Sequence, residues 1–169
     1  GSVLKLFTIN KDIISYQRDD KSFSEPSFKS TILNEEQDKA KEDIIKIQEH
    51  SHKPIVLEGV TGSGKTEVYF DLIECEINQS KQILIMVPEI SLTPQLENRF
   101  KERFGIDIVI WHSKITPKRR KEIWHKCYEG EPVVVIGARS SLFLPFTNLG
   151  LTVIDEEHDS SYKQEDNIR

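Results

Sequence analysis

The chain has 169 residues, of which 37% are hydrophobic and 30% are charged, enough apolar material for one compact domain with or without a short extension. Its 23 basic and 28 acidic side chains give a net charge of −5, so the surface as a whole does not attract nucleic acid, and any such contact must be local. The two cysteines show neither a disulfide framework nor zinc-ligand spacing, and no apolar run approaches the ~20 residues that span a bilayer. We therefore expect a protein of a reducing cytoplasm, with no zinc site and no membrane contact.

The first thirty residues differ from the rest of the chain. Residues 3–9 (VLKLFTI) could form a strand, and residues 18–27 read as turn and linker. Gly1 and Ser2 resemble the remnant of a cleaved tag, so we expect the chain to be part of a longer protein. We interpret residues 1–30 as this remnant plus the tail of a preceding domain, or as a strand that docks on the main domain, which covers residues 31–169.

From Asn34 onward, helix and strand patterns alternate. Asn34 and Gln37 form a capping-box pattern, and Ala40, Ile44 and Ile47 fit one face of the helix that follows. Further helices are predicted from the glycine-rich loop to residue 78, from Pro94 to residue 105, and from residue 117 to residue 128, the last with an N-cap threonine and proline. Buried strands are predicted at residues 54–57, 82–87, 106–111, 133–136 and 151–154. This alternation predicts an α/β fold with a mainly parallel sheet covered on both faces, in which ligands bind beyond the carboxyl ends of the strands.

Residues 59–66 (GVTGSGKT) match the phosphate-binding pattern G-x-x-x-x-G-K-[ST] in full. The glycines let successive N–H groups point at phosphate oxygens, and the following helix adds its positive end. Lys65 is expected to reach the β- and γ-phosphates, and the Thr66 hydroxyl to bind Mg²⁺. A chance glycine-rich turn is disfavoured because the pattern lies between a strand and a helix. The candidate nucleotide-binding residues are Gly59, Val60, Thr61, Gly62, Ser63, Gly64, Lys65 and Thr66.

An acidic pair follows the last predicted strand. Asp155 is expected to hold the Mg²⁺ hydration shell, and Glu156 to orient or deprotonate the attacking water. An ordinary acidic turn is the alternative interpretation, which the upstream phosphate loop disfavours. A catalytic glutamate argues for hydrolysis of ATP by water rather than for phosphate transfer to a metabolite.

Residues 155–158 (DEEH) resemble the acidic box of the superfamily-2 helicases and translocases. Other segments match in the same order, namely residues 33–37 with the adenine-reading glutamine segment, residues 87–95 with motif Ia, and residues 137–143 with motif Ib. The chain is most similar to the replication-restart helicases of this superfamily, and the similarity covers about residues 33–169. It implies a three-layer RecA-like first motor lobe of an ATP-dependent 3′–5′ DNA helicase that acts in primosome assembly.

The same resemblance implies particular residue roles. Gln37 would read the adenine, His158 would couple the ATP site to the DNA, and motifs Ia and Ib would contact single-stranded or forked DNA. Other primosome proteins and single-strand-binding proteins would be partners of the longer protein. Ala138 stands where the family usually has threonine, which puts one phosphate contact in doubt. The implied DNA-contact residues are Ser91, Thr93, Arg139, Ser140, Tyr162 and Lys163.

Because the resemblance ends within the first lobe, the second lobe and its arginine finger are not expected here. We therefore expect this chain to bind nucleotide but to hydrolyse it poorly. Alternatives are another superfamily-2 translocase (of the RecG or restriction type), a small P-loop kinase or G protein, and an interaction module with a silent nucleotide site. The basic run at residues 118–121 fits either a solvated helix face or a DNA contact. Trp111 and Trp124 are interpreted as core or helix-packing residues.

Overall fold

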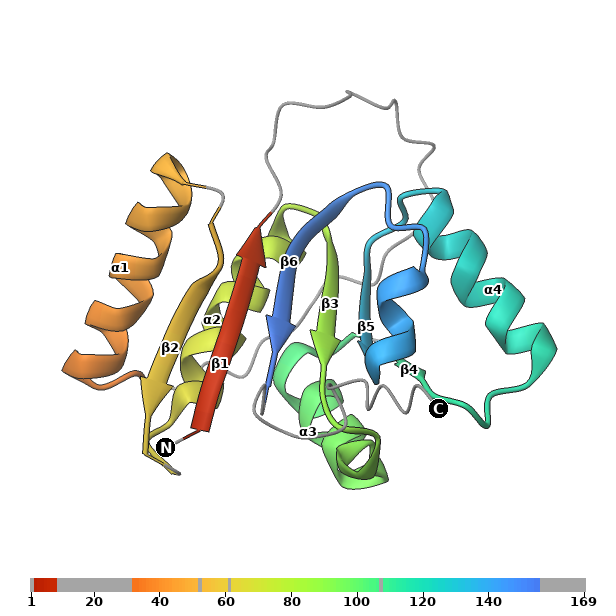
Figure 1. Cartoon of the computed structure of the whole chain (residues 1–169), viewed down its shortest axis with the longest axis horizontal. Helices are drawn as coiled ribbons and strands as arrows, with labels where there is room; N and C mark the ends of the chain where they lie inside the picture. Colours follow the sequence, from red (N-terminus) through yellow and green to blue (C-terminus); the bar gives the residue numbers. More distant parts are fainter. Residues whose placement is uncertain (1, 9–31, 52, 61, 107, 156–169) are drawn as a thin grey trace, which may run out of the picture.

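The computed structural model describes residues 2–8, 32–51, 53–60, 62–106 and 108–155. These residues form one six-stranded sheet with helices packed against it (Figure 1). In chain order the elements are β1 (Ser2–Thr8), α1 (Glu35–His50), β2 (Ile55–Gly59), α2 (Lys65–Asn78), β3 (Gln82–Met86), η1 (Glu89–Ser91), α3 (Pro94–Phe104), β4 (Ile108–Trp111), α4 (Pro117–Tyr128), β5 (Val133–Gly137), η2 (Arg139–Phe143) and β6 (Leu149–Ile154).

The sheet is mainly parallel, as the sequence predicts, but one of its strands runs antiparallel to its neighbours. The order is β2-β1-β6-β3-β5-β4, and the four strands β6, β3, β5 and β4 run parallel to one another. β1 runs antiparallel between β2 and β6, pairing Lys5 with Val56 on one side and with Ile154 on the other. The strand expected near residues 3–9 is therefore present, and it joins the strand before the phosphate loop to the strand before Asp155.

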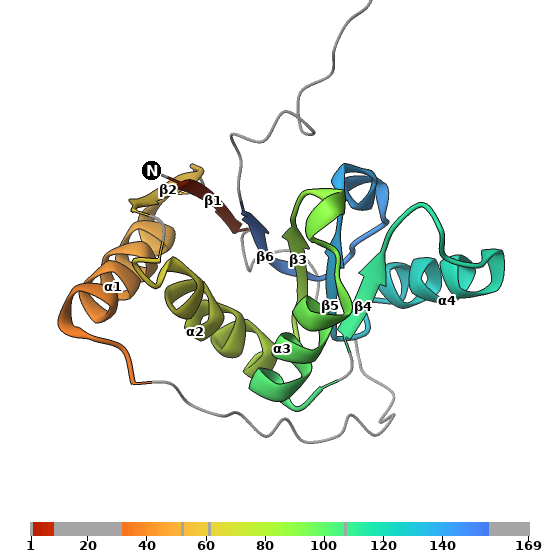
Figure 2. The same ribbon diagram turned by 90° about the horizontal axis from the view of Figure 1, so that it is seen from below.

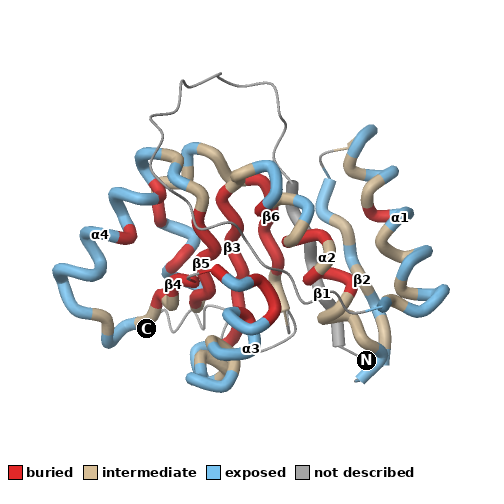
Figure 3. Tube along the Cα trace, turned by 180° about the vertical axis from the view of Figure 1, so that it is seen from behind, coloured by how far each residue is buried: buried red, intermediate tan, exposed pale blue. Residues whose placement is uncertain are grey.

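Two apolar layers cover the two faces of the sheet. Alternate residues of β3 point to opposite faces, so Ile83 and Ile85 pack with α1, α2 and α3, whereas Leu84 and Met86 pack with α4. Figure 2 shows α1, α2 and α3 side by side on one face. In Figure 3 the buried residues concentrate in the central strands, while the outer faces of α1 and α4 are exposed. The result is the three-layer α/β arrangement.

Local signals in the sequence place the helix ends correctly. The Asn34–Gln37 capping box is present in both directions, with 2.9 Å between each backbone nitrogen and the side-chain oxygen it contacts. Thr93 and Thr116 each cap a helix that begins with proline. Gly105 ends α3 in the left-handed conformation, with φ of 62°.

Two apolar residues lie elsewhere than predicted. Ile47 is 46% exposed, and the neighbouring Ile45 packs against the core beside Ile44. The helix is therefore rotated slightly from the predicted face, because it covers only the edge of the sheet. Trp111 is buried as expected, but Trp124 is 42% exposed and stacks on Tyr128 with 5.2 Å between ring centroids. No helix in the described ranges is long and apolar enough to cross a membrane.

Gln82, at the start of β3, is a fully buried polar side chain. Its Nε2 lies 2.9 Å from the Cys127 carbonyl and 3.2 Å from those of Lys126 and Glu131. Its Oε1 accepts hydrogen bonds from the backbone nitrogens of Thr147 and Asn148, at 3.1 and 2.9 Å. One side chain thus joins the end of α4 to the segments that lead into β5 and β6.

Candidate nucleotide site and nucleic-acid interface

The glycine-rich loop at residues 59–66 connects the carboxyl end of β2 to α2. Gly62 and Gly64 both have φ of 82°, a left-handed conformation that other residues rarely adopt. Gly64 is also the N-cap of α2, and no described side chain caps this end of the helix. The first N–H groups of α2 and its positive end are therefore available to an anion.

The Lys65 ammonium group lies over this loop. Its Nζ donates to the carbonyl oxygens of Gly59 and Val60, at 2.9 and 3.0 Å, and lies 3.4 Å from Ser63 Oγ. A Cβ added at Gly59 would lie 2.6 Å from Ser63 Oγ, so a side chain there would force the Ser63 hydroxyl out of its place beside the ammonium group. The positive charge is thus held at the centre of the loop, as a phosphate-binding lysine requires.

Gln37 reaches the same loop from the first turn of α1. While its Oε1 completes the capping box, its Nε2 donates to the Ser63 carbonyl at 3.4 Å. A Cβ at Gly64 would collide with that amide nitrogen and displace the Gln37 side chain, and the positive φ of Gly64 independently favours glycine there. The residue that the sequence links to adenine recognition therefore lies against the phosphate loop.

Thr66 and Asp155, the two predicted Mg²⁺ residues, are brought together by Tyr69. Asp155 directly follows β6, and its backbone nitrogen donates to Met86 O at 2.9 Å. The Tyr69 hydroxyl donates to Asp155 Oδ2 at 3.4 Å and also forms a hydrogen bond with Thr66. Burial raises the pKa of the Tyr69 phenol, the negative charge of Asp155 adds to the rise, and the Thr66 hydrogen bond opposes it. The phenol therefore stays protonated and serves as a donor to the carboxylate.

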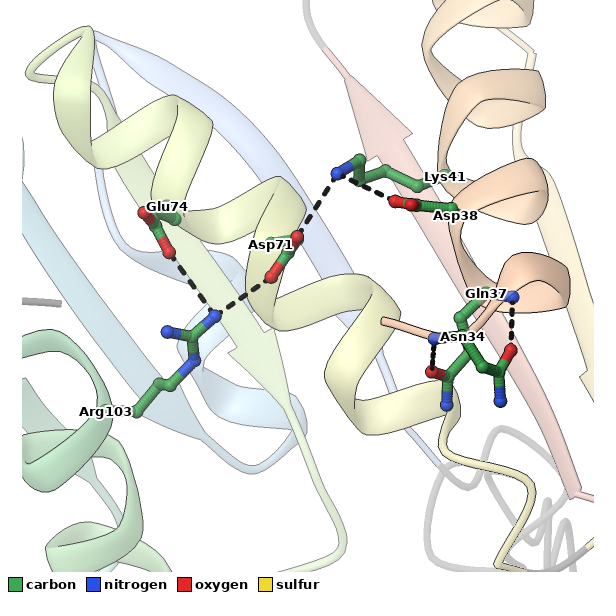
Figure 4. Close-up of polar contacts among 7 residues, drawn as sticks. All are labelled: Asn34, Gln37, Asp38, Lys41, Asp71, Glu74 and Arg103. Atoms are coloured by element: carbon green, nitrogen blue, oxygen red, sulfur yellow. Dashed lines mark hydrogen bonds and ion pairs between the residues drawn. The ribbon is translucent and has the colours of Figure 1, made fainter. Parts of the chain in front are cut away.

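A network of ion pairs fixes α2, the helix that begins at the loop, between α1 and α3 (Figure 4). Arg103, only 6% exposed, contacts Asp71 at 2.9 Å and Glu74 at 3.3 Å. Lys41 of α1 contacts the other oxygen of Asp71 at 3.2 Å. Directly after the loop, Glu67 in the first turn of α2 contacts Arg99 of α3 at 3.2 Å. The direction in which α2 points at the loop is thus set by charges on both neighbouring helices.

The predicted DNA-contact residues that the structure describes lie after β3 and β5. Ser91 ends η1, and Thr93 caps α3 by accepting a hydrogen bond from Leu96 N at 3.3 Å. Arg139 and Ser140 open η2, and both are exposed. Because β3 and β5 are adjacent and parallel, the two segments follow the same edge of the sheet.

A model of the DEAD/DEAH box helicase family matches residues 34–169. This chain belongs to the DEAD/DEAH box helicase family. The match begins at the N-cap of α1, so β1 lies outside the matched residues although it pairs with two strands within them.

Several curated relatives of this helicase domain carry the name replication restart protein PriA. The chain is 54% identical over 142 residues to the one from Rickettsia felis, with 84% of this chain and 21% of that protein covered. Identity to the Bacillus subtilis protein is 46% over 148 residues, covering 85% of this chain and 18% of the relative. For Helicobacter pylori the identity is 41% over 165 residues, covering 96% and 25%. The chain therefore spans about a fifth to a quarter of the length of these relatives.

Some predicted site residues of this helicase domain lie outside the described residues. These are Thr61, Glu156, His158, Tyr162 and Lys163. Conversely, the structure adds Tyr69 and Arg99, which sequence reasoning did not assign. Tyr69 follows Thr66 by three positions and so shares its helix face, a spacing from which its place in the site could have been predicted. Arg99 has no local signal, because its partner Glu67 lies on another helix.

Proposed function

We propose that this chain is the ATP-binding first motor lobe of an ATP-dependent 3′–5′ DNA helicase that acts in replication restart. In this proposal residues 31–169 form the lobe, and the longer protein acts on single-stranded or forked DNA with other primosome and single-strand-binding proteins. The observation that carries the proposal is the hydrogen-bonded series Thr66–Tyr69–Asp155 beside the Lys65 loop. Family membership and the names of the relatives support the helicase reading over a kinase, a G protein or a silent module.

Each residue of the site has a defined task in this proposal. Lys65 exchanges its loop carbonyl contacts for phosphate oxygens, while the N-terminal amides of α2 hold the same anion. Thr66 and Asp155 hold Mg²⁺, and Tyr69 orients the carboxylate of Asp155. The bound metal ion would neutralise charge on the β- and γ-phosphates. Glu156, the residue after Asp155, accepts the proton of the attacking water.

Nucleotide binding by the 169-residue chain tests the site. The affinity for a fluorescent ADP analogue would be measured with and without Mg²⁺. Lys65→Met should lower the affinity by roughly tenfold or more, because it removes charge-assisted contacts to phosphate. Thr66→Ala should remove most of the Mg²⁺ dependence, whereas Thr66→Ser, which keeps the hydroxyl, should retain it. Equal affinities of wild type and Lys65→Met would rule out the phosphate site.

Hydrolysis tests the assignment to one lobe of a two-lobe motor. The chain alone should turn over ATP slowly, with little stimulation by DNA, because the second lobe completes the γ-phosphate site. Rapid DNA-stimulated turnover by the chain alone would contradict this. In the longer protein, Lys65→Ala should abolish unwinding of forked DNA. Unwinding that persists in this variant would contradict the motor function, but it would not contradict the proposal that the chain binds nucleotide.

A further inference from the structure

The start of α4 carries a dense group of positive charges. Lys114, Lys118, Arg119, Arg120 and Lys121 fall within eight positions that contain no acidic residue, in a chain whose net charge is −5. All five are exposed. Among the described residues, only Arg119 of this group forms an ion pair, with Glu122 at 3.3 Å. The charge here is therefore not neutralised by the described part of the fold.

Trp111 joins this group to the predicted DNA-contact segment. Trp111 ends β4 and is only 8% exposed. Its Nε1 donates to Ser140 Oγ at 3.2 Å, while the Arg120 guanidinium lies over its ring, 5.4 Å from the centroid. Arg120 and Ser140 therefore touch the same indole. The cation–π contact also holds the guanidinium in place, which lowers the entropy that binding would otherwise cost.

The loop between β4 and α4 lies at the same edge of the sheet as η1 and η2. β4 is parallel to β5, and Ser113 in this loop donates to Glu89 Oε1 of η1 at 2.8 Å. The loops after β3, β5 and β4 therefore form one continuous row. Figure 1 shows α4 at the end of the sheet opposite to β2 and α1, away from the nucleotide loop.

We propose that Lys114, Lys118, Arg120 and Lys121, which we name the basic turn, form a second DNA-phosphate contact surface. The predicted DNA contacts at residues 91–93 and 139–140 are thereby extended by the basic turn to the β4 edge of the sheet. The inference rests on the proposed function, since it takes DNA as the ligand of this edge. Phosphates recur along either a single strand or a duplex, so a row of exposed cations beside Ser140 fits both.

The basic turn is tested by neutralising charges that no described contact needs. The double variant Lys118→Gln/Lys121→Gln is compared with the double variant Lys39→Gln/Lys53→Gln. Both variants lose two positive charges, but in the second the charges lie within α1 and shortly after it. Affinity of the 169-residue chain for a labelled single-stranded oligonucleotide and for a duplex is measured across a series of KCl concentrations. The α4 pair should reduce the slope of log affinity against log salt by about 1.4 for the single strand or about 1.8 for the duplex. The α1 pair should leave both slopes unchanged.

The outcomes separate this inference from the proposed function. If Arg139→Ala weakens DNA binding and the α4 pair does not, the basic turn is overturned and the motor assignment stands. If the wild type binds neither oligonucleotide, the inference is overturned, while unwinding by the longer protein still decides the proposed function. If the α4 pair loses affinity for a polyglutamate peptide but not for DNA, the surface serves an acidic protein and the inference is wrong. A slope that falls for one oligonucleotide and stays unchanged for the other identifies the strand form that the basic turn binds.

Discussion

The two halves of the sheet are built differently. In β3 and β5 all five residues are buried, because helices or η2 cover both faces of that half. In β2 burial alternates, and Val56 is 50% exposed. The half that carries the predicted DNA contacts is thus packed from two sides, whereas the half that carries the nucleotide loop is packed from one.

The difference shows how the nucleotide half is kept in place. Among the described strands, β2 lies at the edge and pairs with β1 alone, so within the sheet the distance between the loop and Asp155 depends on β1. On the face of the sheet covered by α1, α2 and α3, the same distance depends on the ion pairs that Asp71 forms with Lys41 and Arg103. Backbone pairing and charge supply in this half what two-sided apolar burial supplies in the other. Changes confined to one half should therefore affect its stability and solvent exposure more than those of the other.

The largest effect is expected from Gln82→Met. Methionine keeps the volume but removes the five hydrogen bonds of this buried amide to backbone groups. The Cys127 carbonyl and the Thr147 nitrogen keep other partners, whereas the Asn148 nitrogen and the Glu131 carbonyl lose their bonds to this side chain. The free energy of unfolding should fall by about 4 kcal/mol, measured by urea denaturation. Gln79→Met, at an exposed position, is the control and should change it by less than about 0.5 kcal/mol. A small loss for Gln82→Met would show that the two-sided half does not need this network.

Lys5→Pro should separate the two halves. Proline removes a backbone donor from a strand that is paired on both sides, at a cost of about 3 kcal/mol. Hydrogen exchange should accelerate at β2 amides, and nucleotide affinity should fall, while β3 and β5 stay protected. Ser2→Pro, at the first residue of the strand, should be tolerated. Equal acceleration in all strands would mean that the sheet unfolds as one unit.

Arg103→Met should destabilise the nucleotide half by about 2 kcal/mol. The guanidinium is buried, and its removal leaves Asp71 and Glu74 with less compensation. Lys46→Met removes an exposed pair with Glu42 and should cost at most about 0.5 kcal/mol. Thermal denaturation compares the two variants. If Arg103→Met lowers the affinity for nucleotide more than its loss of stability accounts for, the network also orients α2.

The smallest effect concerns the two thiols, one in each half. Burial raises the pKa of Cys127 to about 12 and also raises the pKa of the exposed Cys75. Because the thiolate is the reactive form, a thiol reagent at pH 8 should modify Cys75 first and Cys127 only as the α4 side opens. Peptide mass mapping over time measures both rates. Similar rates would show that the α4 side opens as readily as the α2 side.

Much of the fold and site follows from local sequence signals. The loop at residues 59–66, the helix caps and Asp155 are set by spacing and residue type, and they lie where those signals place them. The position of β1 could not be predicted, because strand pairing between residues far apart leaves no local pattern. Gln82 reads as an ordinary first residue of a strand, since its partners come from three other segments. The same limit applies to Arg103 and to the link between Trp111 and Arg120.

The place of β1 also bears on the order in which the lobe folds. Lys5 pairs with Ile154, so β1 can complete its ladder only after β6, the last of the six described strands, has been synthesised. Until then β2 and its loop have no strand that joins them to the rest of the sheet. Contacts between such distant residues form slowly because of the loop-closure entropy they cost. We therefore expect the phosphate loop to reach its final position late on the ribosome, after the β3–β5–β4 half has assembled.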